Sequence, residues 1–447
     1  MQVTYWLEHA WLEPTVEPGV ALTSAEGLIT EVRTGVATPP PGATVLRGLT
    51  LPGLANTHSH AFHRALRGTV QVGSGTFWTW RDIMYSVAFH LTPDSYFRLA
   101  RAVYAEMALT GITCVGEFHY LHHQYGGAPY DNPNAMGEAL IAAAGEAGIR
   151  ITLLDAAYLH GGLIRGGYRP LEGAQTRFGD GTADRWYDRW SQLKGGGHAR
   201  IGAALHSVRA FSDRDGYGEF ADRTRGVPVH IHLSEQPAEN AACMAVHGRT
   251  PARLLADSGF WGRHTTAVHA THLTGEDISL LGGAGSTVCM CPTTERDLAD
   301  GIGPAPQLRR AGCQLSLGSD SHAVIDLFEE ARGMELNERL RSRTRGHWTA
   351  AQLLRAASEN GHASLGWPEA GRLETGALAD FTTVALDSVR TAGPPPRLGA
   401  ETAVFAATGA DVRHTVVGGR HIVRDGVHQL VEDVPAALAE AVAAARS

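Results

Sequence analysis

Two histidines separated by one residue, His58 and His60, follow an apolar run that resembles a β-strand, Leu51 to Thr57. Side chains alternate along a strand, so both imidazoles face the same side. Two imidazoles side by side at a strand end supply half of a metal site. Alone, the motif is a weak signal, because short matches of this kind arise by chance.

The other half of a metal site follows in order along the chain. His232, His269 and Asp320 each end an apolar, strand-like run, and Glu235 lies three residues after His232. The ordered set at successive strand ends is a much stronger signal than any single member. His230 shares a face with His232 by alternation, and we assign His232 because it lies at the strand end and near Glu235. A hydrogen-bonded structural histidine, or a helix cap in the case of Asp320, is the alternative for each residue taken alone.

Three imidazoles and one carboxylate suit zinc, which keeps a position for water in its catalytic sites. Iron and manganese remain alternatives. The expected ligands are His58, His60, His232 and Asp320. The chain has a single lysine, Lys194, in a glycine-rich loop that is a poor place for a residue bridging two metals. The sequence therefore predicts one metal ion.

The chemistry that this set supports is hydrolysis at a C=N carbon. A bound metal lowers the pKa of water and supplies a nucleophile near neutral pH. The nitrogen then needs a proton, and Glu235, just beyond the strand end, can shuttle one. His269 can orient the water or stabilise the developing charge. Glu235, His269 and Asp320 are therefore the predicted catalytic residues.

Polar residues at other strand ends indicate the substrate. Arg81 belongs to Phe77-Trp-Thr-Trp-Arg81, expected in a long loop after the first strand, and Tyr120 and Arg209 follow two further strands. Two arginines and a tyrosine at one barrel mouth suit a carboxylated substrate, because guanidinium binds carboxylate bidentately. Simple packing of the aromatic loop and surface salt bridges of the arginines are the alternatives.

Eight strand-like runs, most of them separated by helical stretches, predict a closed (β/α)₈ barrel of TIM type, with its active site at the carboxyl ends of the strands. Strand-like segments at both chain ends predict a second, smaller β domain. We expect this β domain over 1–49 and 371–430, the barrel over 50–370, and a C-terminal helix in 431–447. The eight expected barrel strands are Thr50–Asn56, Thr113–Phe118, Arg150–Ala156, Arg200–Leu205, Val227–Leu233, Thr265–Ala270, Ser286–Cys291 and Gln314–Gly318.

The composition limits the partners of the chain. Its 447 residues carry a net charge of -8, which argues against a nucleic-acid surface. Five cysteines form no even framework, as in proteins of a reducing cytosol. The N-terminus lacks signal-peptide features, and no apolar stretch reaches membrane-spanning length. We expect a cytoplasmic protein that acts on a small molecule and contacts neither nucleic acid nor membrane.

The motifs together resemble the amidohydrolase superfamily, in its mononuclear deaminase branch. The resemblance is closer still to the formimidoylglutamate deiminases of histidine degradation, and it covers nearly the whole chain. The segments that carry it are Ser59-His-Ala-Phe-His-Arg-Ala65, Phe77-Trp-Thr-Trp-Arg81, Glu117-Phe-His-Tyr-Leu-His-His123, His206-Ser-Val-Arg-Ala210, Val229-His-Ile-His-Leu-Ser-Glu-Gln236, Val268-His-Ala-Thr-His272 and Gly318-Ser-Asp-Ser-His322.

The resemblance implies zinc and a small dicarboxylate substrate, N-formimino-L-glutamate, hydrolysed to N-formyl-L-glutamate and ammonia. It implies substrate contacts for Arg81, Tyr120, His206 and Arg209, and a contact at His63, where glutamine is expected in relatives. The segment from Thr294 to Gly301 also departs from the expected pattern. Relatives of this kind often form homodimers, and we expect one here.

Two other functions stay open. One is deamination of a purine, pyrimidine or similar ring, whose pocket would not need two arginines. The other is a non-catalytic metal-binding scaffold, against which the complete ligand set and Glu235 argue.

Overall fold

Eight parallel strands form a closed barrel in the computed structural model, which describes residues 2–72 and 77–446. Each strand pairs with its neighbour in chain order, and a bridge between Ser59 and Asp320 joins the first strand to the last. The predicted (β/α)₈ barrel is confirmed. Its strands are β5 (Leu54–Ser59), β6 (Ile112–His119), β7 (Arg150–Ala157), β10 (Ala199–Leu205), β11 (Val229–Leu233), β12 (Thr265–His269), β13 (Thr287–Met290) and β14 (Gln314–Leu317).

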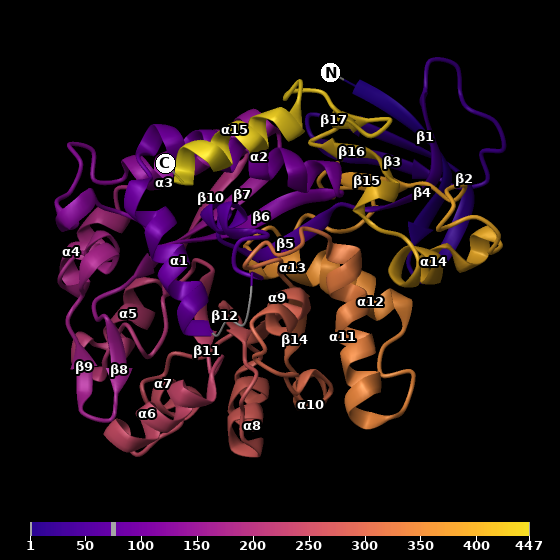
Figure 1. The fold of residues 1–447 in the computed structure, drawn as a ribbon. Coiled ribbons are helices and arrows are strands. Elements are labelled where there is room, and N and C mark those ends of the chain that lie inside the picture. Colours follow the sequence, from indigo (N-terminus) through magenta and orange to yellow (C-terminus); the bar gives the residue numbers. More distant parts are fainter. Residues whose placement is uncertain (1, 73–76, 447) are drawn as a thin grey trace.

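Helices surround the barrel, and in Figure 1 most of them lie below and to the left of its strands. Strands β6 and β7 are buried along their whole length, because side chains fill the barrel and helices cover its outside. Threonine is the N-cap residue of several helices. The side chains of Thr92 and Thr349 each accept a hydrogen bond from the backbone N–H three residues further along the chain. The helices are α1 (Phe77–His90), α2 (Pro93–Leu109), α3 (Ala135–Ala147), α4 (Ala183–Trp190), α5 (Tyr217–Arg223), α6 (Pro237–His247), α7 (Pro251–Asp257), α8 (Gly275–Ala284), α9 (Pro292–Asp297), α10 (Ala305–Ala311), α11 (Leu327–Ser342), α12 (Ala350–Ala357) and α13 (Glu359–Ser364).

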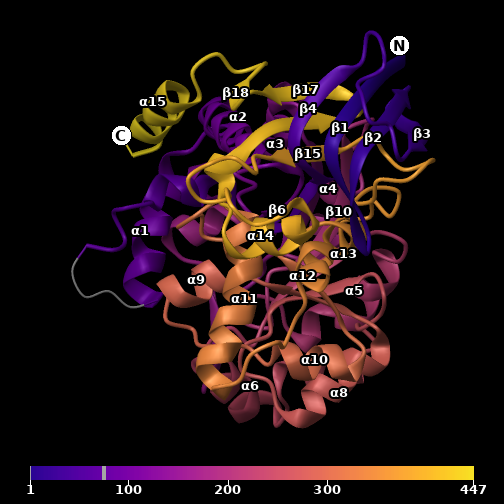
Figure 2. The ribbon, with the colours of Figure 1, turned by 90° about the vertical axis from the view of Figure 1, so that its right-hand side faces the viewer.

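A second eight-stranded sheet combines both chain ends, as predicted. Strand β4 pairs with β15 in antiparallel fashion, so the N-terminal and C-terminal segments form one sheet. In Figures 1 and 2 this sheet and α15 both lie at the end of the molecule opposite α8 and α10. The elements are β1 (Gln2–Leu12), β2 (Thr15–Ala25), β3 (Leu28–Arg33), β4 (Thr44–Pro52), β15 (Phe381–Val384), β16 (Val412–Val417), β17 (Arg420–Arg424), β18 (Val427–His428), with α14 (Gly399–Phe405) and α15 (Val434–Arg446).

A buried ion pair connects this sheet to the barrel. Arg150, the first residue of β7, donates from Nε to Asp380 Oδ2 over 2.6 Å and from Nη2 to Oδ1 over 3.1 Å. Asp380 Oδ1 also accepts from the Gly418 backbone N–H, over 2.7 Å. Because Arg150 begins its strand, the contact lies at the amino end of the barrel. The carboxyl ends of the strands are thereby left for the site.

Three expected elements differ in the structure. The predicted strand Thr50–Asn56 is divided, because β4 ends at Pro52 and β5 begins at Leu54. A side chain at Gly53 would lie 2.3 Å from Thr113 Oγ1, so the chain changes sheet at a residue that must be glycine. Phe77–Arg81 does not lie in a loop but begins α1. The sequence also predicts one helix over Ala350–Ser364, after the barrel strands, but this helix is broken at Ser358, whose φ of -131° and ψ of -90° are not helical.

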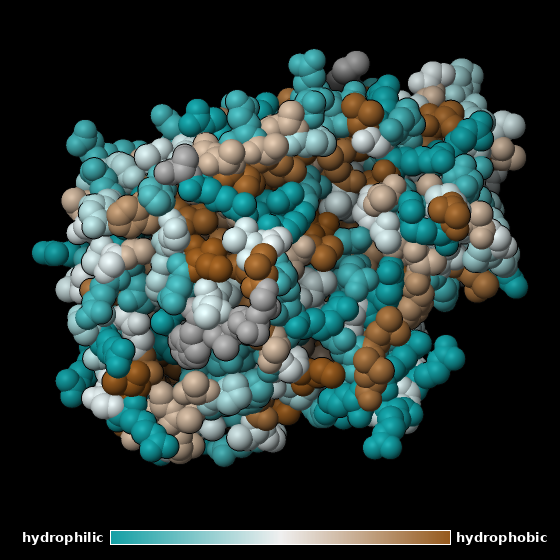
Figure 3. All heavy atoms as spheres, in the orientation of Figure 1, coloured by the Kyte–Doolittle hydropathy of each residue, from teal (hydrophilic) through white to brown (hydrophobic). Residues whose placement is uncertain are grey.

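The surface shown in Figure 3 is covered mostly by hydrophilic residues, and the hydrophobic residues form small separate groups. None of the helices in the described part of the chain is long and apolar enough to cross a membrane. The domain boundaries and the homodimer remain predictions.

Candidate active site

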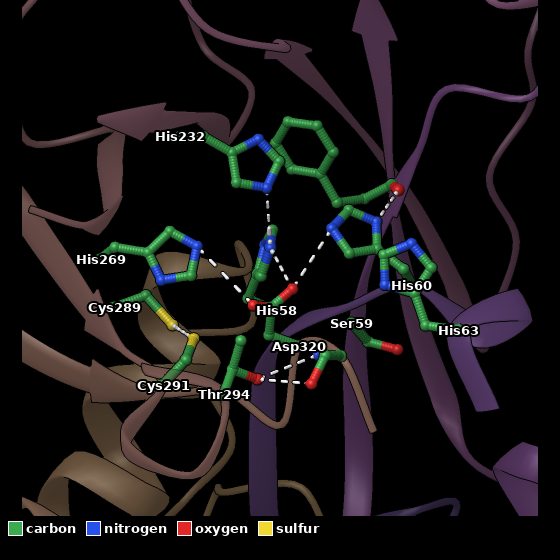
Figure 4. A network of polar contacts seen from close by, with 12 residues as sticks. His58, Ser59, His60, His63, His232, His269, Cys289, Cys291, Thr294 and Asp320 are labelled. Atoms are coloured by element: carbon green, nitrogen blue, oxygen red, sulfur yellow. Dashed lines mark hydrogen bonds and ion pairs between the residues drawn. The ribbon is translucent and has the colours of Figure 1, made fainter. Parts of the chain in front are cut away.

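The four predicted metal ligands converge at the carboxyl end of the barrel (Figure 4). One ligand atom from each of His58, His60, His232 and Asp320 lies within 4.8 Å of the others, and all four residues are buried. Asp320 Oδ1 is 3.3 Å from His58 Nε2 and 3.4 Å from His60 Nε2, and the Nε2 atoms of His58 and His232 are 3.1 Å apart. The structure thus brings together all four residues that the sequence singles out.

Backbone carbonyls orient two of the three imidazoles and fix which ring nitrogen carries the proton. His60 Nδ1 donates to the Phe118 carbonyl over 2.9 Å, and His232 Nδ1 donates to the His206 carbonyl over 2.8 Å. A carbonyl only accepts, so each Nδ1 carries the proton and each Nε2 lone pair faces the cluster. Burial, and then the neighbouring His58, lower the pKa of His60 to about 3. Neutral imidazoles around a carboxylate fit a divalent metal such as zinc.

Close packing of the first and last barrel strands places His58 beside Asp320. The Asp320 backbone N–H donates to the His58 carbonyl over 3.0 Å. A side chain at Gly318 would come within 2.8–2.9 Å of His58 Cβ, N and O. Behind them, Asn56 and Ser319 exchange two hydrogen bonds of 2.7 and 2.9 Å. Glycine at 318 is therefore a requirement of the site.

His230 does not join the cluster. Its Nε2 lies 3.4 Å from the Ser364 carbonyl, in α13, and burial lowers its pKa to about 3. The choice of His232 over its neighbour on the same face therefore agrees with the geometry.

A second histidine cluster, His119 and His122 with Asp155, lies near the carboxyl ends of β6 and β7. Both oxygens of Asp155 already accept hydrogen bonds from Arg189, and Oδ1 also accepts from Trp186 Nε1. A metal here would have to displace a buried arginine, so this cluster is a structural network.

The four predicted ligands His58, His60, His232 and Asp320 are called the metal cluster below. Glu235 and His269 lie beside it and line the same cavity. His269 Nε2 is 3.9 Å from Glu235 Oε1 and 3.7 Å from Asp320 Oδ2. Both ring nitrogens of His269 are buried and have no hydrogen-bond partner among the described residues. Ser234, His269 and Asp320 also have positive φ angles of 49°, 66° and 39°. Such backbone strain in residues other than glycine is typical of functional sites.

Glu295 is a residue of the site that the sequence analysis missed. Its Oε1 lies 3.6 Å from His269 Nδ1 and accepts from the Cys291 backbone N–H over 2.9 Å. Burial alone lowers the pKa of His269, but Glu295, Glu235 and Asp320 outweigh burial and raise it to about 10. Position 295 falls in the Thr294–Gly301 segment, which departs from the pattern expected of the family, and this departure is its only sequence signal.

A cavity of about 340 Å³ opens above the cluster, and all five predicted substrate residues line it. Arg81 comes from α1, Tyr120 follows β6, and His206 and Arg209 follow β10. His63 lies in a 3₁₀ helix, Ala61–Leu66, and its Nε2 is 3.1 Å from the Tyr120 hydroxyl. Further lining residues that were not predicted from the sequence are Tyr85, Tyr158 and Arg169.

Two carboxylates of the protein partly neutralise the charge of Arg209. Its Nη2 donates to Glu235 Oε2 over 2.9 Å, and its Nε is 3.3 Å from Glu239 Oε2. Glu239 was not predicted, because an acidic residue in the first turn of a helix usually serves the helix dipole. Arg209 therefore connects the proposed proton shuttle to a second, fully buried carboxylate.

Residues 49–422 match the family model of the amidohydrolase family. The chain belongs to this family. It is a hydrolase acting on carbon–nitrogen bonds.

The relatives include enzymes for different substrates. The chain is 34% identical to a formimidoylglutamate deiminase of Pseudomonas aeruginosa over 419 residues, 91% of each chain. It is 32% identical to a 5-methylthioadenosine/S-adenosylhomocysteine deaminase of Natronomonas pharaonis over 384 residues, 84% of this chain and 82% of the relative. A solved amidohydrolase from Brucella melitensis superposes over 100% of both chains with a TM-score of 0.89 and 31% identity.

Proposed function

We propose that this amidohydrolase is a zinc-dependent deiminase that converts N-formimino-L-glutamate and water to N-formyl-L-glutamate and ammonia. The observation that carries the proposal is the cavity lining, in which Arg81 and Arg209 join Tyr120 and His206 above the metal cluster. Carboxylates removed from water need charged partners, and guanidinium groups meet this need. Similarity to the Pseudomonas deiminase supports the same substrate.

His58, His60, His232 and Asp320 would hold one zinc ion. When bound, zinc supplies a water molecule of lowered pKa as the nucleophile. The neutral, Nδ1-protonated imidazoles described above are the ligand form that such an ion requires.

Glu235 is the proposed proton shuttle. It accepts a proton as water adds to the C=N carbon and delivers it to the imine nitrogen, which becomes an amino group on a tetrahedral carbon. Glu235 then transfers the proton of the new hydroxyl group to that nitrogen, so that the C–N bond breaks, ammonia leaves and the carbon becomes the formyl group. Arg209 holds Glu235 Oε2, which leaves Oε1 on the His269 side. His269 and Asp320 face each other across the reacting centre, where His269 stabilises negative charge developing on oxygen.

Ammonia release by purified, zinc-loaded protein tests the proposal. N-formimino-L-glutamate should be turned over far faster than guanine, cytosine, adenosine or 5-methylthioadenosine, and its esterified analogues should be poor substrates. A nucleobase or nucleoside that proves the better substrate would overturn the proposed substrate while leaving the metal chemistry in place.

A further inference from the structure

The carboxyl group of Glu117, near the end of β6, is fully buried beside the segment that carries His58 and His60. Its Oε2 accepts from the Ser59 hydroxyl over 2.8 Å, and its Oε1 accepts from the Ala61 backbone N–H over 2.6 Å. Ser59 and Ala61 are the two neighbours of His60 in the chain. Glu117 does not line the cavity, so it can act on the site only through this segment.

The residue after Glu117 holds His60 itself. The Phe118 carbonyl accepts from His60 Nδ1 over 2.9 Å, so two successive residues of β6 hold three successive residues at and just beyond the end of β5. The backbone fixes the same place, because Ser59 pairs with Glu117 on one side and with Asp320 on the other. The end of β5 is thereby held between β6 and the segment that follows β14.

The chain changes from strand to helix at His60. Strand β5 ends at Ser59, and the 3₁₀ helix Ala61–Leu66 begins two residues later, with an N-cap, His60, whose side chain makes no cap hydrogen bond. The N–H groups in the first turn of a helix lack a partner within the helix, and Glu117 supplies one for Ala61. In Figure 4 the Ser59 side chain points away from the metal cluster, as alternation along a strand requires.

In the described ranges 2–72 and 77–446, no residue forms an ion pair with Glu117. A buried carboxyl group without a charged partner destabilises the folded protein unless hydrogen bonds offset the cost. An apolar side chain would fill the same space without that cost, so packing does not explain a glutamate at this position. What the carboxyl group adds is a pair of acceptor atoms for the two residues that flank a proposed ligand.

We propose that Glu117 is a positioning residue that sets the affinity of the site for zinc, an inference that rests on the proposed zinc site. By holding Ser59 and Ala61, it fixes the direction in which His60 Nε2 faces the metal cluster. Replacing a group that orients a metal ligand typically costs about 10–100-fold in metal affinity or activity.

The test compares Glu117→Ala and Glu117→Gln with the control Glu335→Ala. Glu335 is a buried glutamate of α11 that accepts from the backbone N–H groups of Gly346 and Trp348 over 3.0 Å each, outside the metal cluster. Zinc affinity is measured by competition with a chromophoric chelator. Glu117→Ala should bind zinc about 10–100-fold more weakly. Glu117→Gln should stay close to the wild-type affinity, because its amide oxygen still accepts from Ala61, and the control should lower Tm without changing zinc affinity.

Two further readouts separate positioning from loss of stability. Cobalt(II) bound in place of zinc has a visible absorption spectrum that depends on the geometry of its ligands, and this spectrum should change in Glu117→Ala but not in Glu335→Ala. At saturating zinc, Glu117→Ala should have a lower kcat and a nearly unchanged KM for N-formimino-L-glutamate, because the residues that line the cavity are intact.

Unchanged zinc affinity and an unchanged cobalt spectrum in Glu117→Ala, or equal zinc losses in the alanine and glutamine variants, would overturn this inference. If Glu117→Ala does not fold, Ser59→Ala removes one of the two hydrogen bonds by a smaller change, and unchanged zinc affinity there would overturn it as well. Zinc affinity does not depend on the substrate. A wild type that binds zinc but does not hydrolyse N-formimino-L-glutamate would therefore overturn the proposed substrate alone, whereas a wild type that binds no zinc would overturn both.

Discussion

Arg209 stabilises the fully buried carboxylate of Glu239. The variant Arg209→Met should therefore lower the stability of the folded protein. The Glu239 side chain is 0% exposed, and its Oε1 accepts from the Ser234 backbone N–H over 3.0 Å. Burial raises the pKa of Glu239, and the Arg209 charge counteracts that rise. Without Arg209 the carboxylate must stay charged and unpaired, or take up a proton.

Removing one partner of a buried ion pair typically costs about 3–5 kcal/mol. The entropy of unfolding is about 2.1 cal/mol/K per residue, so over 447 residues that loss lowers Tm by about 3–5 °C. The double variant Arg209→Met/Glu239→Gln removes both charges and should recover most of the loss. The pKa of Glu239 is raised in the folded protein by burial. The loss of stability in Arg209→Met should therefore grow as pH rises and shrink as pH falls.

Thermal unfolding of zinc-loaded protein at several pH values, with Arg165→Met, a change at an exposed arginine, as the control, measures these differences. Both Arg209 variants should also lose about tenfold or more in kcat/KM for N-formimino-L-glutamate, because a carboxylate contact is lost. A single variant as stable as the wild type, or a double variant less stable than the single, would refute the role of Arg209 as the charge partner of Glu239.

Four further predictions concern the metal, the proton shuttle, a glycine and the acid limit of stability. Metal analysis should find about one equivalent of zinc per chain, lost in His232→Ala; two tightly held equivalents would contradict the single shell. Glu235→Gln should keep its zinc while kcat falls about 10²–10⁴-fold, whereas zinc loss in that variant would make Glu235 a ligand. Gly318→Ala should weaken zinc affinity, because the new methyl group collides with His58; zinc titration by calorimetry against Gly283→Ala, a glycine with open space around it, checks this. Burial raises the pKa of Asp180, but His123 and Arg189 outweigh it and hold the pKa well below its usual range. This stabilisation is present above about pH 4 and lost as pH falls further, so Asp180→Asn should be less stable at pH 7 and lose less stability on acidification; parallel pH–Tm curves would contradict it.

The barrel and the metal cluster could be predicted because their signals are local. Alternation along a strand fixes the side on which His58 and His60 lie, and His232 lies near the end of another strand, three residues before Glu235. Parallel strands of a barrel then bring all these ends to one face. The positions of these residues follow from periodicity, without any knowledge of side-chain packing.

Other parts of the site leave no periodic signal. Strands β8 (Gly162–Ile164) and β9 (Gly167–Arg169) have three residues each, too few for alternation to be recognised, so Arg169 could not be placed. Glu239 and Glu295 act through contacts with residues on other elements, which only tertiary packing defines. The same holds for the change of sheet at Gly53, where a close approach to Thr113 divides what looks like one strand.

The contact that joins the first and last barrel strands, β5 and β14, has a consequence for biosynthesis. Asn56 and Ser319, which hydrogen-bond beside the metal cluster, are 263 positions apart. At about 5–20 residues per second, the ribosome needs roughly 15–50 s to synthesise the segment between them. During that time the nascent chain exposes an unpaired strand edge and an incomplete set of ligands. Uptake of the proposed zinc ion would therefore belong to the finished polypeptide, because a truncated product that ends before Asp320 lacks both the closing strand contact and the fourth proposed ligand.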